Sequence, residues 1–304
     1  MYSSIKKKIK KYLEKKVGAL LEPSISKVMI NNFSLNQQMQ IFLKLFYKEQ
    51  VIDKKKKFSF DEVGFDVYSS TFEDGILQYI FSIIGMETRK CVDIGCGAIN
   101  GSNVANLIIN HGFKGLLIDG NSEQISITKN YYNIHPESSV DPPIAVWEMV
   151  NIENIDSILK KNGFVGRIDL LSIDLDGIDY WIWKAIKVVK PRVLLVEYQD
   201  ALGPSRSWTI PYEPNFNLKD YEVNRNDYNY VGASLNAFVK LGKEKGYRLV
   251  GCNKGGWNAF FIASGIADDL LPEVSTESCF KYERNQYSMK YRFPLIADLP
   301  WDEV

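Results

Sequence analysis

The chain has 304 residues, of which 45% are hydrophobic and 13% aromatic, and its formal net charge is zero. This composition predicts a substantial core and excludes a disordered chain. The length suits one large domain, or one domain with a cap. No apolar run approaches the roughly 18 residues of a membrane span, and the lysine-rich start lacks the apolar stretch of a secretory signal. The four cysteines show no C-x-x-C spacing, which predicts free thiols in a reducing cytoplasm.

Residues 1–60 are predicted to form a basic helical arm or cap. Residues 1–57 hold 14 Lys and 4 Asp or Glu, a charge of about +10, and apolar residues recur at helical spacing among the first lysines. These apolar residues are Ile5, Ile9, Tyr12, Leu13 and Val17. Two roles stay open. The apolar stripe packs on the domain or on a second subunit of a homo-oligomer, or the helix lies on an anionic membrane surface at the inner face of the membrane. Nucleic acid is not expected, because no aromatic platform or base-reading motif accompanies the lysines.

Residues 61–265 alternate strand and helix patterns, which predicts an α/β, Rossmann-like domain with helices on both faces of a mostly parallel sheet. The predicted helices are 72–84, 102–111, 180–189 and 234–245, and the seven predicted strands are 90–94, 115–119, 144–149, 167–174, 192–197, 247–252 and 258–263. The last two strands are joined too tightly for a crossover helix, so they must be antiparallel. Residues 266–304 are predicted to be an extended tail that packs on the domain or on a partner.

A glycine turn follows the first strand, and a carboxylate ends the second. Gly95 and Gly97 form the turn, and Asp119 comes 22 residues after Gly97. This order is typical of a nucleotide-like ligand, whose ribose diol donates hydrogen bonds to the acid. A dinucleotide site would need a third glycine where Asn100 stands. Asp93 repels a pyrophosphate but suits the ammonium and sulfonium of S-adenosylmethionine, so that cofactor is favoured over a nicotinamide dinucleotide or a turn without a ligand.

The cofactor contacts follow from this turn. Asp93, Gly95 and Gly97 are expected around the methionine moiety, and Asp119 at the ribose with assistance from Asn121. Adenine is expected near Val150 and Asn151, after the third strand.

Four carboxylates are predicted to meet at the ends of the fourth and fifth strands: Asp174, Asp176, Glu197 and Asp200. Such a group needs cations, protons or a metal. Three interpretations stay open: a Mg²⁺ site formed by all four, an Asp or Glu general base without metal, and pure positioning with Asp176 capping the next helix. The two histidines, His111 and His135, should lie at the opposite edge of the sheet and are not expected to be catalytic.

The acceptor side is indicated by a turn and by aromatic residues. Lys254, in the turn 253–258, either neutralises an acidic acceptor or is solvated. Trp208 and Tyr212 lie in a long segment that is typical of a lid or binding loop. Aromatic rings beside carboxylates favour a sugar, a surface glycan or another hydroxylated small molecule as the acceptor.

Over residues 66–265 the chain resembles FkbM-type S-adenosylmethionine-dependent methyltransferases. The resemblance lies in the motifs 72–76, 92–95 with Gly101 and Asn103, 115–119, 172–177, 196–198, 232–234 and 258–261. It implies a class I methyltransferase fold, S-adenosylmethionine as cofactor and Asn103 among the cofactor contacts. The sequence therefore predicts a cytoplasmic S-adenosylmethionine-dependent O-methyltransferase. The alternatives are an NAD(P)-dependent oxidoreductase and a binding protein that keeps the fold without turnover.

Overall fold

The computed structural model describes residues 36–304. Residues Tyr47–Val304 form one compact unit, and the helical residues 36–46 belong to a separate one. The predicted lysine-rich helix of the first 17 residues lies outside the described residues, so its membrane and subunit contacts stay predictions, as do the domain boundaries at residues 60 and 265. In the part of the chain that is described, no helix is long and apolar enough to cross a membrane.

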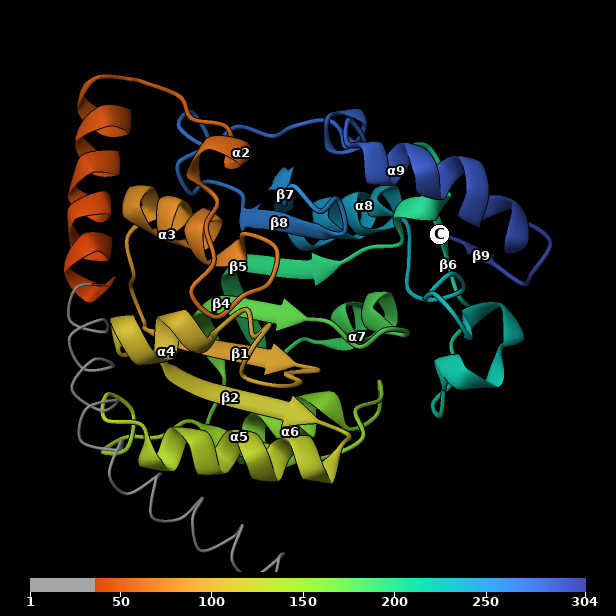
Figure 1. The fold of residues 1–304 in the computed structure, drawn as a ribbon, viewed down its shortest axis with the longest axis horizontal. Helices are drawn as coiled ribbons and strands as arrows, with labels where there is room; N and C mark the ends of the chain where they lie inside the picture. Colours follow the sequence, from red (N-terminus) through yellow and green to blue (C-terminus); the bar gives the residue numbers. More distant parts are fainter. Residues whose placement is uncertain (1–35) are drawn as a thin grey trace, which may run out of the picture. The chain divides into compact units, whose positions relative to one another are not determined.

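A seven-stranded sheet forms the centre of the main unit (Figure 1). Across the sheet, the strands are β3 (Ile144–Trp147), β2 (Lys114–Asp119), β1 (Lys90–Ile94), β4 (Gly166–Ile173), β5 (Val189–Glu197), β8 (Asn258–Ala263) and β7 (Tyr247–Cys252). β8 is antiparallel to both β5 and β7, and the other neighbouring pairs are parallel. The predicted parallel sheet with a terminal antiparallel hairpin is confirmed, and with it the class I methyltransferase fold.

Helices cover both faces of this sheet. They are α2 (Phe60–Val63), α3 (Glu73–Ile84), α4 (Ala105–His111), α5 (Ser122–Ile134), α6 (Ile155–Lys161), α7 (Asp179–Ala185) and α8 (Leu235–Lys245). Successive residues of a strand point to opposite faces of the sheet, and two adjacent residues of β8 illustrate this. The Phe261 ring lies 5.7 Å from Trp183 of α7, and the Phe260 ring lies 5.5 Å from Phe60 of α2. The central strands are therefore buried on both sides, as parallel sheets require.

The structure corrects two predicted elements between α7 and β5. The helix ends at Ala185 and not at residue 189, because Ile186 adopts an extended conformation. β5 begins three residues earlier than predicted, at Val189, which pairs with Gly166 of β4. Pro191 cannot continue a helix. Residues 189–191 pair with β4 and so belong to the sheet.

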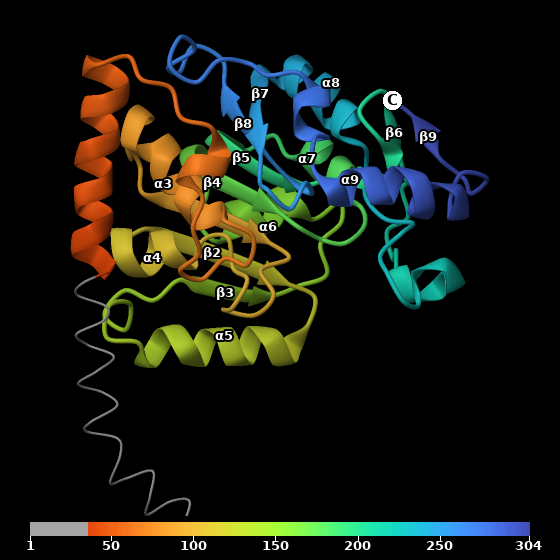
Figure 2. The same ribbon diagram turned by 45° about the horizontal axis from the view of Figure 1, so that its top comes forward.

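The C-terminal segment is more helical than the sequence indicates. It contains α9 (Glu283–Tyr287), the π-helical turn η6 (Ser288–Arg292), the 3₁₀ turn η7 (Phe293–Leu295) and the short strand β9 (Asp302–Glu303). β9 pairs with β6 (Trp208–Thr209), and Figures 1 and 2 show these two strands side by side. The expectation of an extended tail is wrong, because buried side chains such as Asn285, Ser288 and Arg292 anchor its turns.

Two glycines of the turn after β1 differ in what a side chain would meet. A Cβ on Gly95 would lie 1.7 Å from the Asp174 carbonyl oxygen, whereas a Cβ on Gly97 would have no atom within 4 Å. Both residues have a positive φ, 80° and 51°, so both substitutions carry backbone strain. Only Gly95 is also required by close packing.

We expect Gly95→Ala to lower the free energy of unfolding by more than about 4 kcal/mol, because the loops after β1 and β4 must separate. Gly97→Ala is the matched control and should cost about 1 kcal/mol from backbone strain alone. Urea unfolding of the two variants measures the difference. Equal destabilisation would contradict the importance of the contact.

Candidate active site

A cavity of about 550 Å³ opens at the carboxyl ends of β1, β2 and β4. These strands flank the point where the chain order of the sheet reverses, which is where ligands bind in open α/β sheets. Six of the predicted site residues line the cavity: Gly95, Gly97, Asp119, Asn121, Asp174 and Asp176. The two histidines do not line it. His111 ends α4 and His135 follows α5, two helices whose first residues come after the cavity loops.

Backbone amides hold the Asp119 carboxylate in place at the end of β2. Its Oδ2 accepts a hydrogen bond from the Gly97 N–H at 2.9 Å, and its Oδ1 accepts one from the Asn121 N–H at 2.7 Å. The Asn121 side chain in turn caps α5 by accepting from the Glu123 and Gln124 N–H groups. Each carboxylate oxygen keeps a further lone pair. Asp119 is therefore a fixed acceptor that can receive two more donors from the cavity.

A smaller apolar slot of about 60 Å³ adjoins the cavity. It shares Asp119, Gly120, Met149, Leu175 and Phe216 with the larger space and is also lined by Glu148, Val150, Ile178 and Pro214. Val150 lies where the sequence predicted, but Asn151 does not line the slot, because its side chain accepts from the Glu153 and Asn154 N–H groups. Asn151 thus lies outside the residues that line either space, and its contact with the cofactor stays a prediction.

Phe216 is a wall of the site that sequence reasoning missed. A Cβ on Gly177 would lie 2.5 Å from its ring, so the ring lies directly over that glycine. Phe216 comes from the long segment after β5, where no periodic pattern marks individual residues. The only sequence signal was the length of the loop itself.

Two other predicted cofactor residues, Asp93 and Asn103, lie behind the cavity and do not line it. The Asn103 amide donates to the Ser172 hydroxyl at 3.3 Å. Burial raises the pKa of Asp93 to about 7, against hydrogen bonds from the Ser172 and Ser102 side chains that lower it. Asp93 is buried near the end of β1 beside these serines, and its contact with the methionine moiety stays a prediction.

Asp174, Asp176 and Glu197 come together as predicted. Each offers a carboxylate oxygen within 4.8 Å of the others, and all three are half-buried. We name these three residues the carboxylate cluster. Burial raises the pKa values of Asp174 and Glu197 well above their ordinary range, and repulsion from neighbouring carboxylates, Asp176 and Asp179 among them, adds to this. Burial also raises the pKa of Asp176, to about 6.

Asp179 takes the structural role that was one possibility for Asp176. Its two carboxylate oxygens accept hydrogen bonds from the Leu175 N–H at 2.8 Å and from the Gly177 N–H at 3.0 Å. The backbone amides of the loop after β4 are thereby satisfied. Asp176 itself has a left-handed backbone with φ of 51°, a conformation that Asp tolerates better than most residues. Its carboxylate is left at the cavity wall.

Asp200 does not belong to the carboxylate cluster, which corrects the predicted fourth metal ligand. Its Oδ1 lies 3.0 Å from an Arg292 guanidinium nitrogen, and its Oδ2 lies 3.7 Å from Arg284 and 3.4 Å from the Asn285 amide. All three partners come from the C-terminal segment. The sequence does not show where that segment folds, so it could not show that Asp200 is already paired with two arginines.

Lys254 also lies apart from the cavity-lining residues. Its ammonium is 6.0 Å from the centre of the Phe72 ring. This contact does not support the predicted role of Lys254 in neutralising an acidic acceptor. The side chain follows the tight turn toward the start of α3 and not toward the carboxylate cluster.

A second, small cavity of about 70 Å³ lies on the other side of the carboxylate cluster. Its walls include Glu197, Gln199, Tyr228, Trp257 and Arg284. The Arg284 guanidinium lies 4.3 Å from the centre of the Trp257 ring. Because Asp174 and Asp176 line the large cavity and Glu197 lines the small one, the carboxylate cluster stands between the two spaces.

The predicted lid aromatics pack elsewhere. Trp208 stacks on Trp301 with ring centres 6.3 Å apart. The Tyr212 hydroxyl donates to Glu153 at 3.0 Å and accepts from the Ile152 N–H. Neither residue lines the two cavities, and Trp257 is an aromatic side chain that does line the small one.

Comparison with known proteins adds little. No protein-family model matches this chain, and no curated protein matches it. It overlaps magnesium protoporphyrin IX methyltransferase from Synechocystis PCC 6803, solved with bound SAM, at a TM-score of 0.40 and 9% identity, covering 63% of this chain and 78% of that one. An O-methyltransferase from Bacillus cereus in complex with SAH gives 0.38 and 12%, covering 71% and 89%. Overlaps this loose carry no argument, and the class I methyltransferase fold is identified from the strand order of the sheet.

Proposed function

We propose that this protein is an S-adenosylmethionine-dependent methyltransferase that acts on a hydroxyl oxygen. The observation that carries the proposal is Asp119, an acceptor fixed by two backbone amides at the edge of a cavity large enough for the cofactor. The ribose diol would donate to its free lone pairs. The apolar slot beside it, between Met149 and Phe216, suits a flat adenine ring, and the glycine turn with Asp174 would face the methionine end.

A nicotinamide dinucleotide fits the same turn less well. Its pyrophosphate would need free amides at the start of α4. The Ser102 hydroxyl oxygen already accepts from the Val104 and Ala105 N–H groups, at 3.3 and 3.2 Å. This local cap takes the donors that a pyrophosphate would use, which favours the methyltransferase over the oxidoreductase.

Asp119→Ala is expected to weaken binding of S-adenosylhomocysteine by about 10- to 100-fold, because two charge-assisted hydrogen bonds to the ribose are lost. Isothermal titration calorimetry measures the change. Asp269→Ala, at an exposed position outside both cavities, is the matched control and should bind as the wild type does. Wild-type protein that binds NADH and not S-adenosylhomocysteine would overturn the proposal.

The carboxylate cluster supplies the base. When bound, S-adenosylmethionine provides an electrophilic methyl group, which the acceptor oxygen takes as the carbon–sulfur bond breaks. The acceptor's hydroxyl proton must then leave. Asp174 and Glu197 hydrogen-bond to each other, and this pairing requires a proton between them. Asp176, whose pKa burial raises to about 6, is the member that is ionised at neutral pH and free to receive the acceptor's proton.

This assignment predicts a pH profile. Activity should fall as the pH drops through about 6, where Asp176 becomes protonated. Asp176→Asn should lower the rate by roughly 10²–10⁴-fold, measured as methyl transfer from radiolabelled cofactor to a panel of hydroxylated acceptors. A variant of unchanged rate that still binds cofactor would leave the protein as a binding protein and would contradict the enzymatic role.

The same substitution should stabilise the ligand-free protein at about pH 8. Because the pKa of Asp176 rises from 3.8 to about 6 on folding, its contribution to stability is fully present below its unfolded value and is lost as the pH rises through about 6. Allowing for solvent screening at a half-buried site, the loss is about 1–2 kcal/mol.

Thermal unfolding measures the predicted gain in stability of Asp176→Asn. Asp176→Asn should melt a few degrees above the wild type at about pH 8 and close to it near pH 4. Asp269→Asn, the exposed control, should show no such pH dependence. A lower melting temperature for Asp176→Asn at about pH 8 would show that the ionised carboxylate is stabilising, contrary to the pKa direction.

A second candidate role for the carboxylate cluster is a divalent-metal site, which its oxygens within 4.8 Å of one another favour. Asp174, Asp176 and Glu197 would hold a hard ion such as Mg²⁺, which would supply positive charge to orient and acidify an acceptor hydroxyl. Activity that is lost in EDTA and restored by Mg²⁺ would support this role. Full activity in EDTA would exclude it and leave the proton-accepting role.

The acceptor we propose is a sugar, a surface glycan or a small hydroxylated metabolite. The small cavity combines the Trp257 and Tyr228 rings with polar groups such as the Tyr228 hydroxyl and the Glu197 carboxylate. Rings pack against the apolar face of a sugar, and carboxylates and hydroxyls bind its hydroxyl groups. Membership of the FkbM-type methyltransferases, which use this cofactor, is part of the same proposal and rests on the sequence motifs alone.

A further inference from the structure

One wall of the large cavity in the candidate active site comes from outside the sheet. Phe216, Asn217 and Leu218 line this cavity, and Phe216 also lines the apolar slot together with Pro214. These residues belong to the long segment between β6 and α8. Figures 1 and 2 show this segment, coloured teal, beyond the carboxyl ends of the parallel strands. The cavity is therefore bounded on one side by chain that belongs neither to the sheet nor to the helices that cover it.

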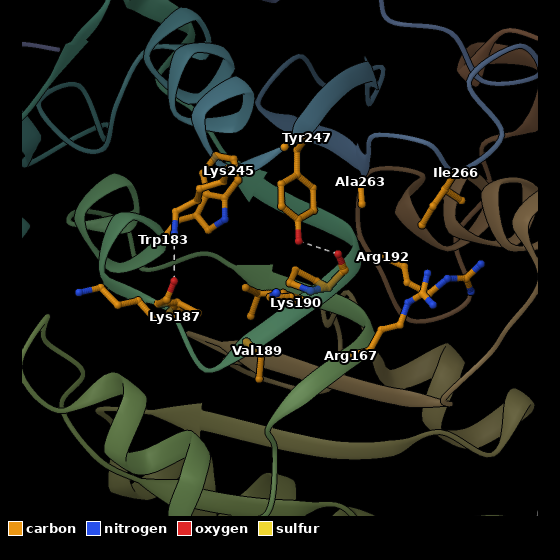
Figure 3. Close-up of a pocket in the computed structure, with 14 residues that line it drawn as sticks. Arg167, Trp183, Lys187, Val189, Lys190, Arg192, Lys245, Tyr247, Ala263 and Ile266 are labelled. Atoms are coloured by element: carbon orange, nitrogen blue, oxygen red, sulfur yellow. Dashed lines mark hydrogen bonds between the residues drawn. The ribbon is translucent and has the colours of Figure 1, made fainter.

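A groove at the opposite edge of the sheet is built differently (Figure 3). Its walls come from the strands and helices of the domain, such as Trp183 of α7 and Tyr247 of β7. The Tyr247 hydroxyl donates to the Pro191 carbonyl at 2.7 Å, and the Lys245 ammonium donates to the Ile186 carbonyl at 2.9 Å. These bonds join its walls to one another, so that groove is a fixed part of the fold.

The segment that walls the active-site cavity is fastened at its two ends. The Ile210 N–H donates to the Gly232 carbonyl at 3.0 Å, which closes the chain between them into a loop. At one end, the Tyr212 hydroxyl is hydrogen-bonded to residues just before α6. At the other end, the Tyr228 carbonyl accepts from the Gln199 amide at 3.1 Å. Residues 213–226 lie between these anchors, and we name them the cavity loop.

A buried asparagine gives the cavity loop a fixed shape of its own. The Asn224 Nδ2 donates to the Leu218 and Tyr230 carbonyls at 3.0 and 3.1 Å. Its Oδ1 accepts from the Asn229 and Tyr230 N–H groups at 3.1 and 2.8 Å. Because one side chain satisfies four backbone groups, the turns of the loop are held to one another and to its base. The loop can therefore move as one body.

Few contacts hold the cavity loop against the rest of the domain. Among its residues, all of which the structure describes, Asn224 alone is buried. Segments with little buried apolar surface open at a much lower cost than the whole domain unfolds. The Tyr221 ring packs on Tyr230 at the base of the loop, with ring centres 4.8 Å apart, and stacks on Phe216 at 5.7 Å.

The Phe216 ring is the contact that closes the loop on the cavity. It lies over the loop after β4, where a Cβ on Gly177 would be 2.5 Å from the ring. Gly177 thus provides a flat seat for the ring. The seat adjoins the apolar slot, which Phe216 also lines.

We propose that the cavity loop is a lid that closes over the adenine side of a bound cofactor, with Phe216 on Gly177 as its latch, and opens for cofactor exchange. The identity of the cofactor rests on the proposed function, and the movement rests on the build of the loop. An adenine ring in the slot gives Phe216 a second flat partner, so the ligand favours the closed position. Closure also keeps water from the methyl group.

Trypsin measures how often the lid opens, because cleavage follows the population of the open form. Lys219 and Arg225 are exposed residues of the loop, and Lys254 is an exposed lysine outside both cavities. In the full-length protein, saturating S-adenosylhomocysteine should slow cleavage after Lys219 and Arg225 by at least about tenfold. Cleavage after Lys254 should not change. NADH is tested in parallel.

Two variants break the latch from opposite sides. Phe216→Ala removes the ring, and Gly177→Ala places a methyl group in its seat without backbone strain, since Gly177 does not have a positive φ. Each should speed cleavage after Arg225 in the ligand-free protein by about fivefold, the effect of losing one aromatic contact. Glu213→Ala, an exposed position of the same loop that lines neither the cavity nor the slot, is the matched control and should behave as the wild type.

Each other outcome is decisive. Binding of S-adenosylhomocysteine without slower cleavage of the loop, or with equal slowing at Lys254, would overturn the lid and leave the proposed methyl transfer untouched. Protection by NADH and not by S-adenosylhomocysteine would keep the lid and overturn the proposed function. Protection by neither ligand, or unchanged cleavage in both latch variants, would show that the loop is a static wall.

Discussion

The close approach of Gly95 to the Asp174 carbonyl is the contact on which the candidate active site depends. It brings the loop after β1 against the loop after β4 at a distance that no side chain could share. The same turn places the Gly97 N–H on Asp119. One crossing of the main chain therefore fixes the floor of the cavity, the Asp119 carboxylate and the position of the carboxylate cluster.

The carboxylate cluster opposes folding electrostatically. Burial and mutual repulsion raise the pKa values of its members, so the ionised forms are disfavoured in the folded state. Asp179, which accepts from the amides of the loop after β4, adds to the cost, because its charge raises the pKa values of all three members. Such unfavourable local charge is common where a protein must receive a proton or a cation. The proposed proton transfer would use this unfavourable charge.

The C-terminal segment contributes more to the small cavity than its position in the chain suggests. Arg284 covers Trp257, and the Asn285 amide donates to the Gly256 carbonyl at 2.8 Å. Through Arg292 it also neutralises Asp200. The small cavity is thus closed by residues that lie far beyond the sheet in sequence.

The sequence by itself determined the sheet and the residues of the cofactor edge. Strand and helix periodicity, the tight joint between the last two strands, and the spacing from Gly97 to Asp119 are local patterns, and they carry this information without knowledge of distant contacts. Only the tertiary structure decided which polar groups are already satisfied. The Asp93 carboxylate hydrogen-bonds to two serines, and the Asn151 side chain accepts from backbone amides just after it. Asp200 accepts from an arginine 92 residues away. A side chain's availability depends on every neighbour that folding brings to it, and no local pattern records those neighbours.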